Sequence, residues 1–141
     1  QRLLPQMELA KRNGLLGEGR ARRLEKLIDH LDRWLGGVER RPNLLHGDLW
    51  GGNVMAGPDN QPVLIDPAVY FGDREAEIAF TELFGGFSKR FYQAYETVYP
   101  LESGYAGRRD LYNLYHLLNH LYLFGEAYGS QVDAVLRHYV S

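Results

Sequence analysis

Cysteine and long apolar runs are both missing from this chain of 141 residues. Without cysteine there is no disulfide, no thiolate nucleophile and no sulfur ligand for a metal. No stretch approaches the roughly 18 consecutive apolar residues of a membrane-spanning helix. The formal net charge is only −2, and the basic run at 20–26 has acidic residues around it. A solvated helix face is the simplest interpretation of that run, so neither nucleic acid nor a membrane is expected as a partner.

The most specific pattern in the chain is formed by residues 46–53 (HGDLWGGN) and 64–67 (LIDP). It places Asp48 five positions before Asn53 and adds a second carboxylate, Asp66, after a short apolar segment. Phosphoryl transfer from a nucleotide uses such a set. One carboxylate orients and deprotonates the acceptor hydroxyl, while an amide oxygen and another carboxylate hold magnesium. The pattern therefore predicts a site for phosphoryl transfer.

The surrounding residues predict how these side chains meet. The apolar runs Asn53–Ala56 and Pro62–Ile65 have strand length, and the turn formers Gly57–Gln61 lie between them. A β-hairpin is expected, in which Asn53 and Asp66 lie at the same end. Opposite residues of a strand pair are roughly 5 Å apart, so two oxygen ligands there can share one cation.

The stretch Leu44–Thr81 resembles the kinase-like phosphotransferases that act on small molecules, including aminoglycoside, choline and homoserine kinases. Within that group, HGDLWGGN followed by LIDPAVYFGDREAEIAFTELFGGF is similar to the fructosamine kinases, or ketosamine-3-kinases. The resemblance implies transfer of the γ-phosphoryl group of ATP to O3 of a fructosamine or ribulosamine, free or on a protein lysine. It also implies Mg²⁺ as cofactor and the C-terminal lobe of the protein-kinase-like fold.

The resemblance implies a role for each matching residue. Asp48 is expected to be the catalytic base, and Asn53 and Asp66 the magnesium ligands. Trp50 is expected to form an aromatic wall of the substrate site. Each also has a simpler interpretation: turn or cap residues for the three polar side chains, and a buried core position for Trp50.

Two further residues match the family as structural supports. His46 is expected to brace the catalytic loop by donating a hydrogen bond to a backbone carbonyl. Asp73 is expected to fix its loop, or more simply to cap the helix that follows, where Glu75 and Glu77 suit the first turn. Arg74 is interpreted as solvated or ion-paired.

The elements that bind the nucleotide in the first lobe of such kinases are missing from the sequence. These are a glycine-rich loop after a strand, and a strand lysine paired with a helical glutamate. The glycines of 14–19 have no strand before them and are expected to form a loop between helices. Residues 1–141 are therefore expected to be the C-terminal catalytic lobe, with a partner N-terminal lobe outside the chain. The expected location is the cytoplasm, where ATP is found.

The remaining sequence predicts helices, giving an α+β fold that is mostly α. Apolar spacing predicts one helix from about Arg20 to Leu35 and another from Asp73 to Gly85. Three more are expected after Ser88, from Arg108 to Phe124, and after Ser130. The design is a helical bundle whose small β-hairpin carries the catalytic and metal-binding loops.

Other functional interpretations remain open. A kinase for another small alcohol, such as an aminoglycoside, choline or homoserine, fits the same residues. A non-catalytic pseudokinase or interaction domain would not need all of Asp48, Asn53 and Asp66. A metal-dependent phosphohydrolase built on His46 would need further ligands. His116 and His120 have a spacing that suits a metal but are interpreted as packing or surface residues.

Overall fold

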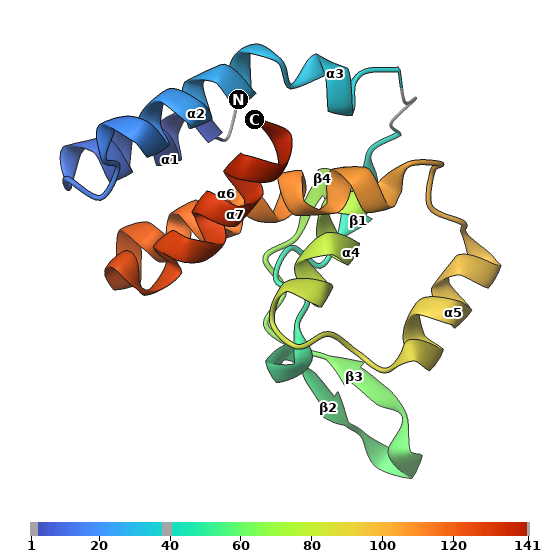
Figure 1. Cartoon of the computed structure of the whole chain (residues 1–141). Coiled ribbons are helices and arrows are strands. Elements are labelled where there is room, and N and C mark those ends of the chain that lie inside the picture. Colours follow the sequence, from blue (N-terminus) through green and yellow to red (C-terminus); the bar gives the residue numbers. More distant parts are fainter. Residues whose placement is uncertain (1–2, 38–40, 141) are drawn as a thin grey trace. The chain divides into compact units, whose positions relative to one another are not determined.

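The computed structural model describes residues 3–37 and 41–140 (Figure 1). The chain forms two compact units. One contains the residues before 38 and after 109, and the other contains the residues between these limits. Both units are mostly helical, and the only strands among the described residues form two small antiparallel pairs in the second unit. The predicted fold class, mostly α with a small β component, is confirmed.

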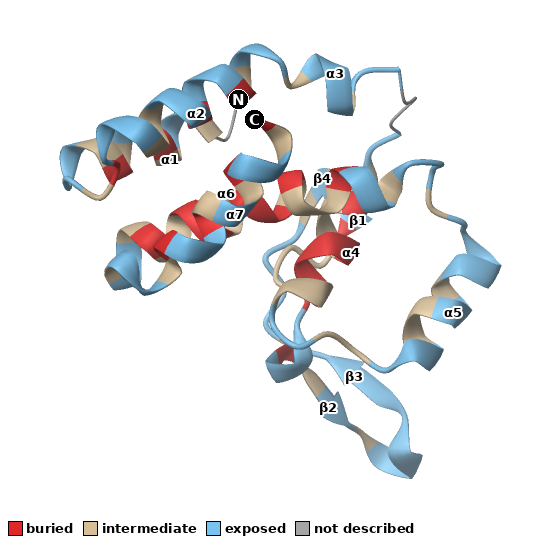
Figure 2. Ribbon diagram, in the orientation of Figure 1, coloured by how far each residue is buried: buried red, intermediate tan, exposed pale blue. Residues whose placement is uncertain are grey.

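The first unit is built from helices alone. It contains α1 (Leu3–Arg12), α2 (Glu18–Asp29), α3 (Asp32–Leu35), α7 (Gly129–Tyr139) and the larger part of α6 (Tyr105–Phe124), which the short 3₁₀ helix Gly125–Tyr128 follows. Figure 2 shows buried positions along α1, α2, α6 and α7. The fully buried side chains are mostly leucines at helical spacing, namely Leu24, Leu27, Leu114, Leu118, Leu121, Val132 and Leu136.

Two predicted helix boundaries in this unit are wrong. The helix expected to reach Leu35 stops at Asp29, where i to i−3 hydrogen bonds from His30 and Leu31 tighten the last turn before α3 begins. The final helix, α7, begins at Gly129, two residues earlier than a cap at Ser130 requires. The loop expected around the glycines of 14–19 is confirmed for Gly14 and Gly17, because α1 ends at Arg12 and α2 begins at Glu18, but Gly19 lies in α2.

Arg20 is not part of a solvated face. Its guanidinium donates to Asp133 at 2.9 Å, to Glu126 at 2.7 Å and to the carbonyl of Leu15 at 2.9 Å. The hydrogen bond from Arg20 lowers the pKa of the Asp133 carboxyl below its ordinary value. The other basic residues of the run are exposed, as expected. Arg20 therefore connects α2 to α7. The sequence pattern did not distinguish this half-buried arginine from the exposed basic residues next to it.

The second unit carries both strand pairs. Strand β1 (Asn43–Leu45) pairs with β4 (Tyr70–Gly72), and β2 (Val54–Ala56) pairs with β3 (Pro62–Leu64). In the β2–β3 hairpin Val54 lies opposite Leu64, so the start of one strand is beside the end of the other. The predicted hairpin is confirmed. Strand β4, which pairs with β1, was not predicted.

Helices α4 (Arg74–Leu83) and α5 (Lys89–Val98) complete the second unit. Asp73 caps α4 by accepting a hydrogen bond from the backbone N–H of Glu75 at 3.0 Å, so the predicted cap is confirmed. No residue of α5 is buried, and Val98 is 86% exposed. Ser88 stands at the N-cap of α5 but makes no side-chain capping bond. No helix in the described part of the chain is long and apolar enough to span a bilayer.

Candidate active site

The predicted catalytic loop follows β1 directly and is held against a second loop. The backbone N–H of Ala68 donates to the carbonyl of His46 at 2.8 Å. Between them, Gly47 has a φ of +87°, and a Cβ at that position would collide with the carbonyl of Ala68. Glycine is therefore required here both for its backbone conformation and for the close approach of the two loops.

Asp48 and Asn53 are brought into direct contact. The side-chain amide nitrogen of Asn53 donates to the carboxylate of Asp48 at 3.0 Å and to its backbone carbonyl at 2.8 Å. Asn53 is buried at 7% exposure, while Asp48 is half-buried. Since the amide nitrogen is committed to Asp48, the amide oxygen of Asn53 is the atom left to face a cation.

The residue before Asp66 is Ile65, whose backbone is hydrogen-bonded to both Asn53 and His46. The backbone N–H of Ile65 donates to the carbonyl of Asn53 at 3.0 Å, and the carbonyl of Ile65 lies 2.9 Å from Nε2 of His46. Asp66 itself is exposed and has a φ of +50°, a left-handed conformation that aspartate tolerates better than most residues. The backbone of Asp66 is thus held next to Asn53.

The donor set of Asn53 and Asp66 suits Mg²⁺. This ion prefers oxygen ligands, keeps several waters and commonly takes only one or two protein carboxylates together with phosphate oxygens. Among the described residues there is no group of three or more His, Cys, Asp or Glu side chains that could hold a metal. One amide oxygen and one carboxylate provide only two protein ligands. Such a site fits an ion that takes its remaining ligands from water and from the phosphates of a nucleotide.

His46 braces the loop with both ring nitrogens. Nδ1 accepts a hydrogen bond from the backbone N–H of Asp48 at 3.3 Å, so it carries no proton. Nε2 then carries the proton and donates to the carbonyl of Ile65. The expected donation from His46 to a backbone carbonyl is confirmed. The His46 ring is thus hydrogen-bonded through both nitrogens, to Ile65 and to the backbone of Asp48.

Glu77 also holds this loop, and the sequence interpretation missed it. Its carboxylate accepts from the backbone N–H of Gly47 at 2.6 Å and from that of His46 at 3.2 Å. Sequence reasoning assigned Glu77 only to the first turn of α4, where it does lie. Nothing in the single sequence indicates that a residue of this helix binds the backbone of a loop about 30 residues earlier.

Replacing Glu77 with alanine is expected to lower kcat of the full-length protein by roughly 10- to 100-fold, because the loop that carries Asp48 loses two anchors. Glu77→Gln keeps one acceptor oxygen and should fall between alanine and the wild type. The matched control is Glu18→Ala, which removes an acidic residue from the first turn of α2. If Glu77→Ala lowers Tm while kcat is unchanged, Glu77 supports the fold alone.

Trp50 does not lie in the core. It is 44% exposed, so the buried interpretation of this residue is wrong. Its indole lies against Gly52, where an added Cβ would overlap the ring. The ring is therefore exposed and lies two residues from Asp48 in the sequence.

Arg74 is not solvated, and among the described residues no carboxylate forms an ion pair with it. It is 7% exposed and donates to the carbonyl of Tyr99 at 2.8 Å and to that of Pro100. Its guanidinium also lies over the Tyr99 ring, 3.6 Å from the centroid. Arg74 therefore provides hydrogen-bond donors to carbonyls at the C-terminal end of α5, which lack partners within the helix.

A buried ion pair joins α4 to α6. Arg108 donates to the two oxygens of Glu75 at 2.9 and 2.8 Å, and the side chains are 6% and 3% exposed respectively. The sequence contained a signal for the burial of each charge, although not for their pairing. Glu75 precedes the buried Ile78 by three residues, and Arg108 precedes the buried Leu111 by three, so both charges lie on apolar helix faces.

The two histidines of α6 are packing residues, as expected. Nδ1 of His120 lies 2.8 Å from the carbonyl of His116, and the His120 ring packs against Phe124 and Tyr128.

The comparisons with known proteins agree on one family. The model of the family described as "Fructosamine kinase" matches residues 1–141. A "Probable ketoamine kinase" of Enterococcus faecium is 50% identical over 120 residues, which cover 83% of this chain and 43% of that protein. The "Protein-ribulosamine 3-kinase, chloroplastic" of Oryza sativa subsp. indica is 42% identical over 116 residues, or 82% of this chain and 34% of that protein.

A solved structure shares the fold. A crystal structure from Thermobifida fusca that is assigned to the fructosamine-3-kinases has a TM-score of 0.87 and 42% identity, and the match covers 97% of this chain and 47% of that one. The chain spans about half the length of the curated relatives it matches. Because the family model covers every residue, the chain belongs to the fructosamine kinase family.

Proposed function

We propose that this chain supplies the catalytic lobe of an ATP-dependent kinase that phosphorylates O3 of a ketosamine, such as a fructosamine or ribulosamine, free or on a protein lysine. The observation that carries the proposal is the contact between Asp48 and Asn53, beside the backbone of Asp66, in a chain of this family. A binding module would have no need to combine these side chains.

In this proposal Asp48 accepts the proton of the acceptor hydroxyl. The transition state of phosphoryl transfer is loose, so bond formation to the hydroxyl oxygen is slight and the proton is accepted late. The hydrogen bond from Asn53 fixes the direction of the carboxylate, and the bond from the Asp48 N–H to His46 fixes its backbone. Mg²⁺ held by Asn53 and Asp66 would neutralise charge on the nucleotide phosphates.

We also propose that an N-terminal lobe completes the ATP site and that the enzyme acts in the cytoplasm. The relatives are about twice as long as the match, and the chain contains no strand lysine or phosphate-covering loop of the kinase type. The 141-residue chain alone is therefore expected to fold but to turn over ATP negligibly.

A panel of acceptors tests the substrate class. The full-length protein is incubated with ATP, Mg²⁺ and one of four acceptors: fructosyl-lysine, ribosyl-derived ketosamine, kanamycin or choline. We expect ADP formation with the ketosamines alone, and ³¹P NMR of the product should show a phosphate ester on O3. A preference for kanamycin or choline would show that the acceptor is another small alcohol and not a ketosamine. A lack of turnover with every acceptor would favour a non-catalytic role.

A further inference from the structure

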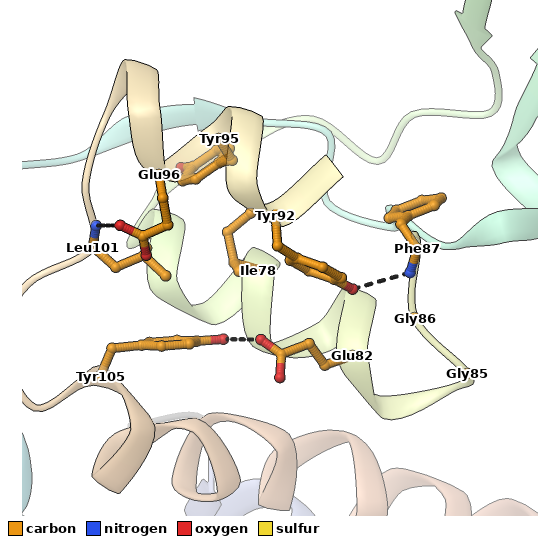
Figure 3. A pocket seen from close by; sticks show the side chains of 10 residues that line it. All are labelled: Ile78, Glu82, Gly85, Gly86, Phe87, Tyr92, Tyr95, Glu96, Leu101 and Tyr105. Carbon is orange, nitrogen blue, oxygen red and sulfur yellow. Dashed lines mark hydrogen bonds between the residues drawn. The ribbon is translucent and has the colours of Figure 1, made fainter. Parts of the chain in front are cut away.

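Two cavities of the chain differ in the charge of the side chains that line them. The larger, of about 380 Å³, lies beside α4 in the second unit, and its walls are aromatic rings with two carboxylates, Glu82 and Glu96 (Figure 3). The smaller, of about 200 Å³, lies in the first unit and is called here the basic cavity. Lys26, His30 and Arg33 line it, and none of the described lining residues is acidic. The two cavities therefore suit ligands of opposite charge.

The three basic residues come from the end of α2 and the start of α3. Lys26 and His30 are four residues apart, a spacing that places side chains on the same side of a helix. The backbone N–H of Arg33 donates to the carbonyl of His30 at 3.0 Å, so the turn between the two helices keeps Arg33 close to His30. Asp29 and Asp32 are neighbours in the sequence but line no part of the cavity. The sequence mixes both charges here, whereas the cavity gathers the positive ones.

The rest of the lining is apolar and packed. Leu27 and Val140 are 1% and 9% exposed and belong to the core of the first unit. The rings of Trp34 and Tyr139 pack edge to face, with their centroids 5.0 Å apart. Helix α2 also packs against α7, so this side of the cavity does not depend on a ligand. The basic cavity thus combines a fixed apolar side with charged side chains that reach solvent.

The ends of two helices offer a simpler role for these charges. His30 and Val140 are the C-cap residues of α2 and α7, so both C-terminal ends lie at the cavity. Each such end carries roughly half a negative charge, which makes about one unit in total. Lys26 and Arg33 alone carry two positive charges. Compensation of the helix ends therefore leaves positive charge for an anion.

We propose that the basic cavity binds a phosphate group, as the free ion or in a small monoester. A guanidinium presents paired N–H donors that match phosphate oxygens, and an ammonium adds a compact positive charge. A phosphate monoester carries roughly 1.5 to 2 negative charges at neutral pH, more than one carboxylate. The volume lies below the usual range for drug-sized ligands, so the ligand is small. The inference does not rest on the proposed function, because the first unit contains none of Asp48, Asn53 and Asp66.

The test follows the resonance of Trp34 by ¹⁹F NMR in the full-length protein labelled with 5-fluorotryptophan. The resonance is assigned by its loss in Trp34→Phe. Inorganic phosphate, phenyl phosphate and phenol are titrated separately at constant ionic strength. We expect saturable shifts with both phosphate compounds, with a Kd of about 1 mM, and none with phenol. Tighter binding of phenyl phosphate would identify a monoester as the ligand, and equal binding of the two would identify the free ion.

Arg33→Gln is expected to raise the Kd at least about fivefold, because it removes a charged donor from the lining. The matched control is Arg22→Gln, an exposed residue of α2 that does not line the cavity, and it should leave the Kd unchanged. Equal effects of the two variants, or a shift with phenol as large as that with phenyl phosphate, would overturn the inference. If Arg33→Gln lowers Tm and neither phosphate compound shifts Trp34, the charges stabilise the helix ends and bind no anion.

Discussion

Asp48→Ala is expected to lower kcat of the full-length protein by about 10²- to 10⁴-fold, the usual contribution of a general base. Nucleotide binding should remain nearly unchanged, because the proposed magnesium ligands are other residues. Asn53 should also stay in place, since its amide keeps the bond to the backbone carbonyl at position 48. Steady-state kinetics with saturating ketosamine, together with a direct measurement of ATP binding, provide the check.

The control for this experiment is Asp59→Asn, in the exposed turn of the hairpin, where the φ of +59° also suits asparagine. It removes one aspartate charge from the same unit and should leave kcat unchanged. If Asp48→Ala retains more than about a tenth of wild-type turnover, the role of general base is wrong.

Arg108→Met is expected to destabilise the unit that contains it by about 3–5 kcal/mol, because it leaves the Glu75 carboxylate buried without a partner. Replacing both members, in Glu75→Met with Arg108→Met, should recover much of this loss, since no uncompensated charge remains. Recovery should be incomplete because Arg108 also donates to the carbonyls of Ser103 and Glu102. Urea unfolding measures both effects.

The two tryptophans allow the loss to be assigned to one unit. Trp50 lies in the unit with the ion pair and Trp34 in the other, so Trp34→Phe leaves a fluorescence signal from the affected unit alone. The matched control is Arg109→Met, whose partly exposed pair with Glu82 should contribute less than about 1 kcal/mol. A loss below about 1 kcal/mol for Arg108→Met would show that the pair contributes no more than a surface contact.

The hairpin and the loop around Asp48 were predictable because their signals are local. Turn formers between two short apolar runs defined the register, and the register placed Asn53 and Asp66 at the same end. The cap at Asp73 was predictable for the same reason, since a capping side chain bonds to a backbone N–H two residues away. Each of these features depends on neighbours within a few positions.

Two residues were misread because their partners are distant in the sequence. Arg74 precedes acidic residues and was interpreted as solvated or ion-paired, yet it binds carbonyls at the end of α5, about 25 residues later. Arg20 belongs to a run of similar residues, but it alone reaches Asp133. The type of residue left both an aromatic wall and a buried position open for Trp50, and the structure shows the side chain exposed, with its ring against Gly52.

The order of residues along the chain was enough to identify the phosphotransferase motif, the family resemblance and the hairpin, because each is encoded by side chains close together in the sequence. The clamp of Glu77 on the catalytic loop, the buried pair of Glu75 with Arg108 and the aromatic cavity beside α4 became visible only in three dimensions. These features join segments separated by up to about 30 residues, and helix packing selects which charged groups meet. Periodicity indicates which face of a helix is buried, but not which distant group it will contact.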